Sequence, residues 1–217
     1  MIDNQSPFIL MIRILTLFTM QYFLCIYALQ AQIIVPQHAN DAYSNFVQEL
    51  ENENFNIDFT AFRFSYLESP QYQISNATSR ANRDLFVDIL AKMEAEDFTN
   101  AIPLLEKYLS FDYTFAGAHY LLRNAYVGLE NEKMAQKHHE IYIQLTESLK
   151  GSVSGASCKE AYMINHIKEA YFLIEHLHYK LIEKPTANTA ENCEIFHVQP
   201  KNEKDKYLHF DVSKIKK

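Results

Sequence analysis

The segment AHYLLRNAYVGLENEKMAQKHHEIYIQL, residues 118–145, decides the fold, because its apolar residues recur every three or four positions. That period is typical of an amphipathic α-helix. The segment carries two such stripes, one after the other, so we predict two consecutive helices that bury one face each. The stripes consist of Ala118, Leu121, Leu122, Ala125 and Leu129, and then of Met134, Ala135, His138, Ile141, Tyr142 and Leu145.

A similar pattern precedes this segment. Leu85, Phe86, Ile89, Leu90 and Met93 form one apolar face. Residues 95–113 contain a further predicted helix, capped by Thr99 or Asn100, so that Pro103 lies in its first turn. Ala101 and Ala135 are 34 residues apart, the period of the tetratricopeptide repeat (TPR). Large or charged residues replace some of the usual small and aromatic ones, so the units resemble TPRs only loosely. The expected fold is mainly α, with TPR-like antiparallel helical hairpins.

The flanking segments complete the expected architecture. Two helices are predicted before residue 68, the first capped by Asp41 and the second beginning at Asp58, and residues 68–79 read as a polar connector. Residues 150–158 form a loop, and a long helix is predicted over 163–181. Residues 193–212 alternate between apolar and polar, which predicts a small C-terminal β-hairpin. We divide the chain into a signal peptide (1–31), an N-terminal lead with the first helix (32–57), and a helical domain ending in the hairpin (58–213).

The N-terminal residues predict export. Arg13 precedes an apolar run from Ile14 to Leu29, and Ala31 offers a cleavage position. Met11 is an alternative start, because it places the positive charge close to the N-terminus. The alternative to cleavage is an uncleaved anchor, which would be the chain's contact with a membrane. The expected location is periplasmic or extracellular.

Composition and motifs exclude several function classes. The net charge of −7 and the absence of a long basic block argue against a nucleic-acid partner. There is no G-x-S-x-G, no P-loop, no dinucleotide fingerprint and no H-E-x-x-H motif. We therefore expect no cofactor and no metal centre. The mature chain keeps Cys158 and Cys193, and export makes a disulfide between them possible, although the sequence leaves this pairing open.

Several short motifs occur in an order that resembles a known family. They are DFTAFRFSYLESPQY (58–72), AHY (118–120), HHEIYIQLTESL (138–149), SVSG (152–155), EAY (169–171) and the closing hairpin. In this order they resemble a family of uncharacterised secreted bacterial proteins, domain of unknown function 4919, over roughly residues 45–213. The resemblance implies no known activity. It marks a set of recurrent positions, which are Asp58, Arg63, Tyr66, His119, His138, Ser152, Gly155, Glu169 and Tyr171.

Three of these residues are the candidates for catalysis. His119 and His138 fall on the two helices of one hairpin, where they could act as acid and base, bind a metal, or simply hydrogen bond inside the core. Glu169 has His166 three residues before it, which predicts either a solvated pair or a polar edge that reaches the 150–158 loop.

The candidates for binding are Asp58, Arg63, Tyr66 and Tyr171. Arg63 could bind an anion, lie across apolar surface, or pair with an acid such as Asp58. The first functional hypothesis is a non-enzymatic module that binds a protein or peptide. The alternative is a hydrolase or metal-dependent enzyme that uses His119, His138 and Glu169.

Overall fold

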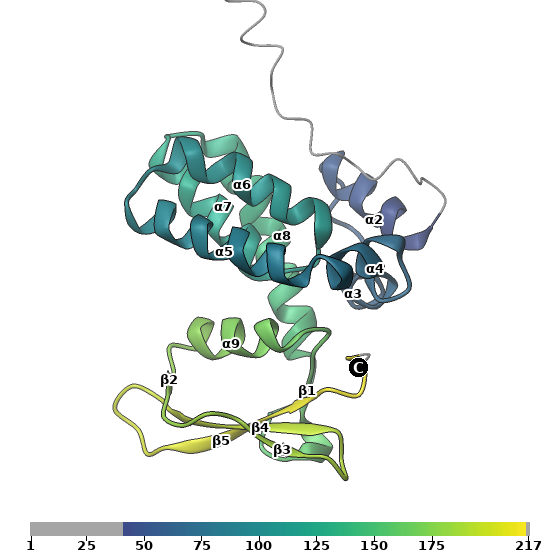
Figure 1. The fold of residues 1–217 in the computed structure, drawn as a ribbon, viewed down its shortest axis with the longest axis vertical. Coiled ribbons are helices and arrows are strands. Elements are labelled where there is room, and N and C mark those ends of the chain that lie inside the picture. The colour runs from purple at the N-terminus through teal and green to yellow at the C-terminus, as the bar shows by residue number, and fades with distance from the viewer. Residues whose placement is uncertain (1–40, 216–217) are drawn as a thin grey trace, which may run out of the picture. The chain divides into compact units, whose positions relative to one another are not determined.

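The computed structural model describes residues 41–215, so the predicted signal peptide (1–31) and most of the lead lie outside the described residues. The described residues form eight α-helices and a five-stranded sheet (Figure 1). The helices are α2 (Ala42–Glu51), α3 (Phe59–Tyr66), α4 (Pro70–Ala77), α5 (Ser79–Glu94), α6 (Phe98–Phe111), α7 (Ala116–Gly128), α8 (Glu132–Lys150) and α9 (Ile167–His176). A short 3-10 helix, Cys158–Glu160, follows α8. The mainly helical fold with a C-terminal sheet is confirmed.

The two N-terminal helices begin where their capping residues predict. The Asp41 carboxylate accepts a hydrogen bond from Ser44 N at 2.9 Å. The Asp58 carboxylate accepts from Thr60 N and Ala61 N, each at 2.9 Å. Each cap satisfies backbone N–H groups that have no partner within the helix.

The polar connector expected over 68–79 is wrong, because most of it is helix α4. Ser69 Oγ accepts from Tyr72 N at 3.2 Å, and Pro70 occupies the first turn, where its missing N–H costs little. Tyr72 is buried, so one aromatic side chain anchors an otherwise polar helix to the core.

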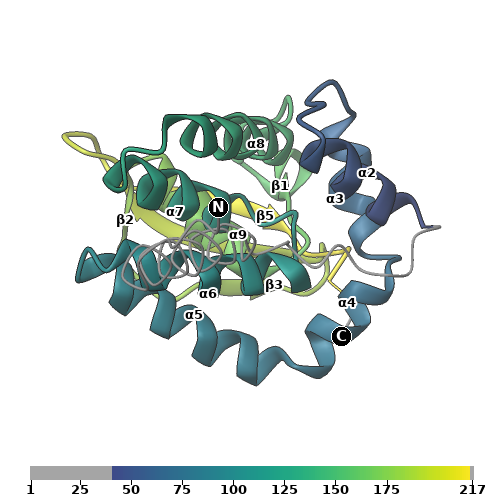
Figure 2. The same ribbon diagram turned by 90° about the horizontal axis from the view of Figure 1, so that it is seen from above.

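Helices α5 to α8 pack in succession, each against the next, as Figure 2 shows from above. Their buried residues follow the predicted stripes and include Ile89, Ala101, Leu105, Leu122, Ala125, Ala135, Ile141 and Leu145. Pro103, however, lies inside α6 and not in its first turn. The helix begins earlier than expected because Ala101 N already donates to Asp97 O at 3.0 Å.

The long helix predicted over 163–181 is also wrong, since only Ile167–His176 is helical. Tyr162–Met163 forms strand β1, which pairs in parallel with β5 (Lys206–Asp211), and Lys180–Leu181 forms β2, which pairs antiparallel with β4 (Cys193–Gln199). Pairing with strands distant in the sequence overrides the helical period of these residues.

The predicted hairpin is confirmed, and it forms the centre of a larger sheet. β4 and β5 are antiparallel, with Phe196 opposite Leu208, and the strand order is β1-β5-β4-β2, with β3 (Thr186–Asn188) also paired to β4. Helix α9 covers one face of this sheet, where Ala170, Leu173 and Ile174 pack on Phe196, Val198, Leu208 and Phe210. An isolated β-hairpin is only marginally stable in water, and packing against the apolar face of α9 stabilises this one. Within the described part of the chain, no helix combines the length and hydropathy needed to span a bilayer.

Candidate functional site

His119 and His138 face each other in the core, as their positions on the α7–α8 hairpin predict. Their Nδ1 atoms are 3.0 Å apart, and His119 Nε2 lies 2.9 Å from Tyr113 O. A carbonyl can only accept, so His119 Nε2–H donates to it and Nδ1 is the acceptor. His138 Nδ1–H must therefore donate to His119, which leaves the buried His138 Nε2 as a lone pair without a partner among the described atoms. This assignment describes the pair with both rings neutral.

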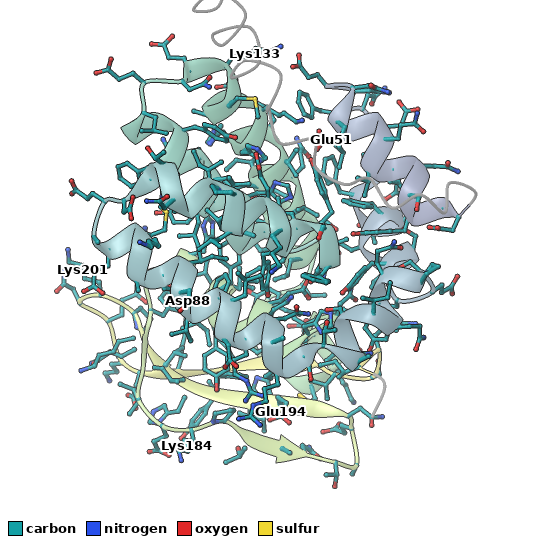
Figure 3. The ribbon with its side chains drawn as sticks, turned by 45° about the horizontal axis from the view of Figure 1, so that its top comes forward. Glu51, Asp88, Lys133, Lys184, Glu194 and Lys201 are labelled. Carbon is teal, nitrogen blue, oxygen red and sulfur yellow. A yellow bond between two sulfur atoms is a disulfide. The ribbon has the colours of Figure 1, made fainter. Side chains whose placement is uncertain are left out.

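Burial determines the electrostatics of this histidine pair. It lowers the pKa of His119 from 6.5 to about 4 and lowers the pKa of His138 well below its ordinary value. Tyr113 contacts His119 edge-on, with ring centroids 4.7 Å apart, and Tyr126 stacks on His138 at 5.7 Å. The Tyr113 hydroxyl donates to Glu51, which Figure 3 labels on α2. The pair is completely enclosed by protein.

Glu169 does not join the histidines, and its predicted solvated pair with His166 is wrong. The Glu169 carboxylate is buried and lies 3.2 Å from the Arg63 guanidinium. It also accepts from Asn165 N at 2.6 Å. Arg63 therefore pairs with Glu169 and not with Asp58, which caps α3 instead.

The Arg63 guanidinium connects the helices to the sheet. It donates to Ser148 O on α8 at 3.2 Å and to Met163 O on β1 at 2.9 Å. In return, Asn165 Nδ2 donates to Arg63 O at 2.7 Å. This buried arrangement ties α3, α8, β1 and the start of α9 together. No described contact joins Glu169 to either histidine of the buried pair.

The sequence reasoning missed a second buried cluster, which is centred on Asp112. Lys168 Nζ lies 2.6 Å from Asp112 Oδ2 and 3.0 Å from the Tyr108 hydroxyl. Burial alone would raise the pKa of Asp112, but the charges of Lys168 and His166 and the hydrogen bonds from Lys168 and Thr114 together outweigh burial and hold that pKa below its ordinary value. Asp112 in turn raises the pKa of Lys168 against the effect of burial. His166 Nε2 is 3.9 Å from Asp112, and burial lowers the pKa of this histidine.

Signals for this cluster are weak in the sequence because its members come from separate elements. Asp112 ends α6, and Lys168 lies in the first turn of α9, 56 residues later. Only the packing of α9 against the helical region brings them together.

The cluster opens into a pocket of about 610 Å³ between α5, α7, α8 and α9. Six aromatic rings line this pocket, those of Phe86, Phe115, Tyr120, Tyr142, Tyr171 and Phe172. The polar lining residues are Lys168, Glu175, His176 and His178. His119, His138 and Glu169 are not among the lining residues, whereas the predicted binding residue Tyr171 is. Concave sites of this size with mainly apolar walls and a few polar groups are typical of ligand binding.

The other predicted binding residues have structural contacts. Tyr66 is buried, and its ring lies 5.3 Å from the Tyr43 ring and 5.5 Å from the Tyr72 ring.

Gly155, one of the recurrent positions of the family resemblance, adopts a positive φ of 69°, and a Cβ there would lie 2.3 Å from the Tyr162 ring. Among the described residues, no group of three or more His, Cys, Asp or Glu side chains is placed to hold a metal ion.

The cysteine pairing that the sequence left open is resolved in favour of a disulfide. Cys158, in the 3-10 helix, bonds to Cys193 on β4, with a Cα–Cα distance of 5.7 Å. The bond fixes the end of the 150–158 loop to the sheet.

These features define an α-helical domain of successively packed helices with a small C-terminal sheet and an aromatic pocket beside a buried ion pair. The chain belongs to the family described as a domain of unknown function (DUF4919), whose profile matches residues 31–217. No curated protein and no solved structure matches the chain.

Proposed function

We propose that this chain is a non-enzymatic interaction module that binds an apolar segment of a protein or peptide in the aromatic pocket. The observation that carries the proposal is the 610 Å³ pocket with its six aromatic rings. Aromatic side chains supply large contact areas and dominate the energetics of many interfaces.

The helical arrangement supports this proposal. Helices α6 and α8 begin 34 residues apart, at Phe98 and Glu132, as in a TPR-like pair of hairpins. In that reading α5–α6 and α7–α8 are the two hairpins, and the first helix of each contributes to the pocket. Stacked hairpins of this kind present concave surfaces that bind extended segments.

Export of the mature chain is part of the same proposal. The disulfide supports it, because disulfides persist in oxidising compartments and are rare in the cytosol. N-terminal sequencing of the chain recovered from a periplasmic fraction tests export, with a new terminus near Gln32 expected. Recovery in the cytosol with the apolar run intact would contradict it.

We do not advance the enzyme alternative. Facing histidines need access to a substrate, and both rings of the buried pair are fully enclosed. Glu169 is engaged by Arg63 and a backbone N–H. None of the three lines the pocket, so no observation favours them as a catalytic group.

A matched pair of variants tests the pocket. Leu90 and Val87 lie on the same helix and are 46% and 60% exposed, and only Leu90 lines the pocket. Peptides selected on the wild-type protein from a random display library should be rich in apolar residues. They should bind L90D at least about tenfold more weakly, because a carboxylate replaces apolar contact, and bind V87D unchanged. Peptides that bind L90D as tightly as the wild type would contradict the proposal.

A further inference from the structure

We infer that the pocket takes a short apolar peptide with both ends free, holding its terminal carboxylate at Lys168 and its terminal ammonium at Glu175. This inference rests on the proposed function and names the chemistry of the occupant.

The positive end of the pocket is Lys168. An ammonium has three N–H donors, and Lys168 uses two of them on Asp112 and on the Tyr108 hydroxyl. The third has no partner among the described residues. The Lys168 side chain is 29% exposed and lines the pocket. Its ammonium is held in place by Asp112 and by the Phe115 ring, whose centroid is 4.6 Å from Nζ. It is therefore a fixed cation in the wall of the pocket.

The negative end is Glu175. Its side chain is exposed, lines the same pocket, and makes no described hydrogen bond or ion pair. Glu175 is thus available for a positively charged group, which a carboxylate binds more strongly than a neutral donor.

The spacing of these two ends sets the length of the ligand. Lys168 and Glu175 both lie on α9, seven residues apart, which is close to two turns and places them on one face. At about 1.5 Å per residue, their Cα atoms are separated by roughly 10 Å along the helix. An extended chain covers roughly 3.3–3.6 Å per residue, so about three residues fit between the two charges.

The walls between these ends require apolar side chains. Tyr171 and Phe172 occupy the same face of α9 between the two charged residues, and Tyr120 and Tyr142 line the pocket from α7 and α8. A charged side chain placed against these rings would lose hydration without an ion pair in return. The complementary ligand is a tripeptide that is apolar in the middle and charged at both ends.

The experiment compares three forms of one probe by calorimetry: trileucine, N-acetyl-trileucine and trileucine amide. The first has both charges, the second lacks the ammonium and the third lacks the carboxylate. We expect trileucine to bind, and each blocked form to bind about tenfold more weakly, because each loses one charge-assisted hydrogen bond.

Variants assign each end to its residue. In E175Q, trileucine and its N-acetyl form should bind equally, while the exposed control E203Q should keep the wild-type preference. K168M alone leaves Asp112 buried without its partner and is prone to unfold, so the double variant K168M/D112N removes both charges together. A folded double variant, judged by its thermal melt, should bind the acid and the amide equally.

The outcomes separate this inference from the proposed function. Suppose that the wild type binds all three probes equally and that L90D binds none of them. This result would overturn the assignment of Lys168 and Glu175 to the two ends of the peptide, and it would leave the proposed binding function of the pocket intact. A preference that persists in E175Q or in the double variant would also overturn the inference. Failure of all three probes to bind, together with display peptides that are indifferent to L90D, would overturn both.

Discussion

Acidification should destabilise this protein through its buried histidine pair. Burial holds His119 and His138 neutral, and a proton on either ring places a charge in the core, where no carboxylate of the described residues contacts the rings. A proton on His119 Nδ1 would also force His138 to change tautomer, because two N–H groups cannot face each other. In the unfolded chain the same rings take up protons freely near pH 6.5. As the pH falls below about 6.5, the unfolded state therefore binds protons that the folded state does not bind.

The size of the effect follows from the pKa of His119. Its folded value is about 4 and its unfolded value is 6.5. The stabilisation is present above pH 6.5 and is lost as the pH falls toward 4, where the folded state also binds the proton. Between pH 7 and pH 5 the linkage relation gives a loss of about 2 kcal/mol from His119 alone. His138, His166 and His176 add losses of the same sign, because burial lowers their pKa values too. His197, whose pKa is raised by Asp205, acts in the opposite sense.

Urea unfolding at pH 7, 6 and 5, followed by circular dichroism, measures this loss. The variant H138N keeps an N–H that can donate to His119 but cannot take up a proton, so its stability should fall less steeply with pH than that of the wild type. The difference should approach about 1.4 kcal/mol per pH unit, the value for one proton. V87N, at an exposed position without a titrating group, is the control and should keep the wild-type slope. A wild-type unfolding free energy that stays constant between pH 7 and 5 would contradict this prediction.

Three further predictions concern stability at neutral pH. R63M leaves Glu169 buried without its partner and should lower the unfolding free energy by about 3–5 kcal/mol in a urea titration; a loss below about 1 kcal/mol would show that the pair is dispensable. Reduction of the Cys158–Cys193 disulfide opens a loop with a sequence separation of 35. This should lower the unfolding free energy by about 4 kcal/mol and the melting temperature by roughly 10 °C, and an unchanged melting temperature would contradict the prediction. G155A places a Cβ at a residue with positive φ and against the Tyr162 ring of β1. It should lower the unfolding free energy by at least about 2 kcal/mol in a urea titration, and an unchanged value would show that the loop can move aside.

The helices were predictable where one face carries most of the burial. The stripes of α7 and α8 predicted the two helices that carry His119 and His138, and Asp41 and Asp58 marked the starts of α2 and α3. Prediction failed where long-range pairing decided the conformation. Met163 and Leu181 carry the helical period, yet they lie in strands that pair with β5 and β4. Helix α4 was missed because a single buried tyrosine, and no stripe, anchors it.

The helical class, the positions of the main helices, the C-terminal hairpin and the family resemblance were predictable from the sequence, because these depend on local period, capping residues and short motifs. Which polar residues meet depends on the tertiary packing. Glu169 is 106 residues from Arg63, and Lys168 is 56 residues from Asp112. A charge becomes buried only when a partner arrives from another element to offset its desolvation, so neither residue of such a pair shows its role in its own neighbourhood. The pocket likewise exists only because α9 packs beside α5 and α7 and brings its aromatic face to theirs.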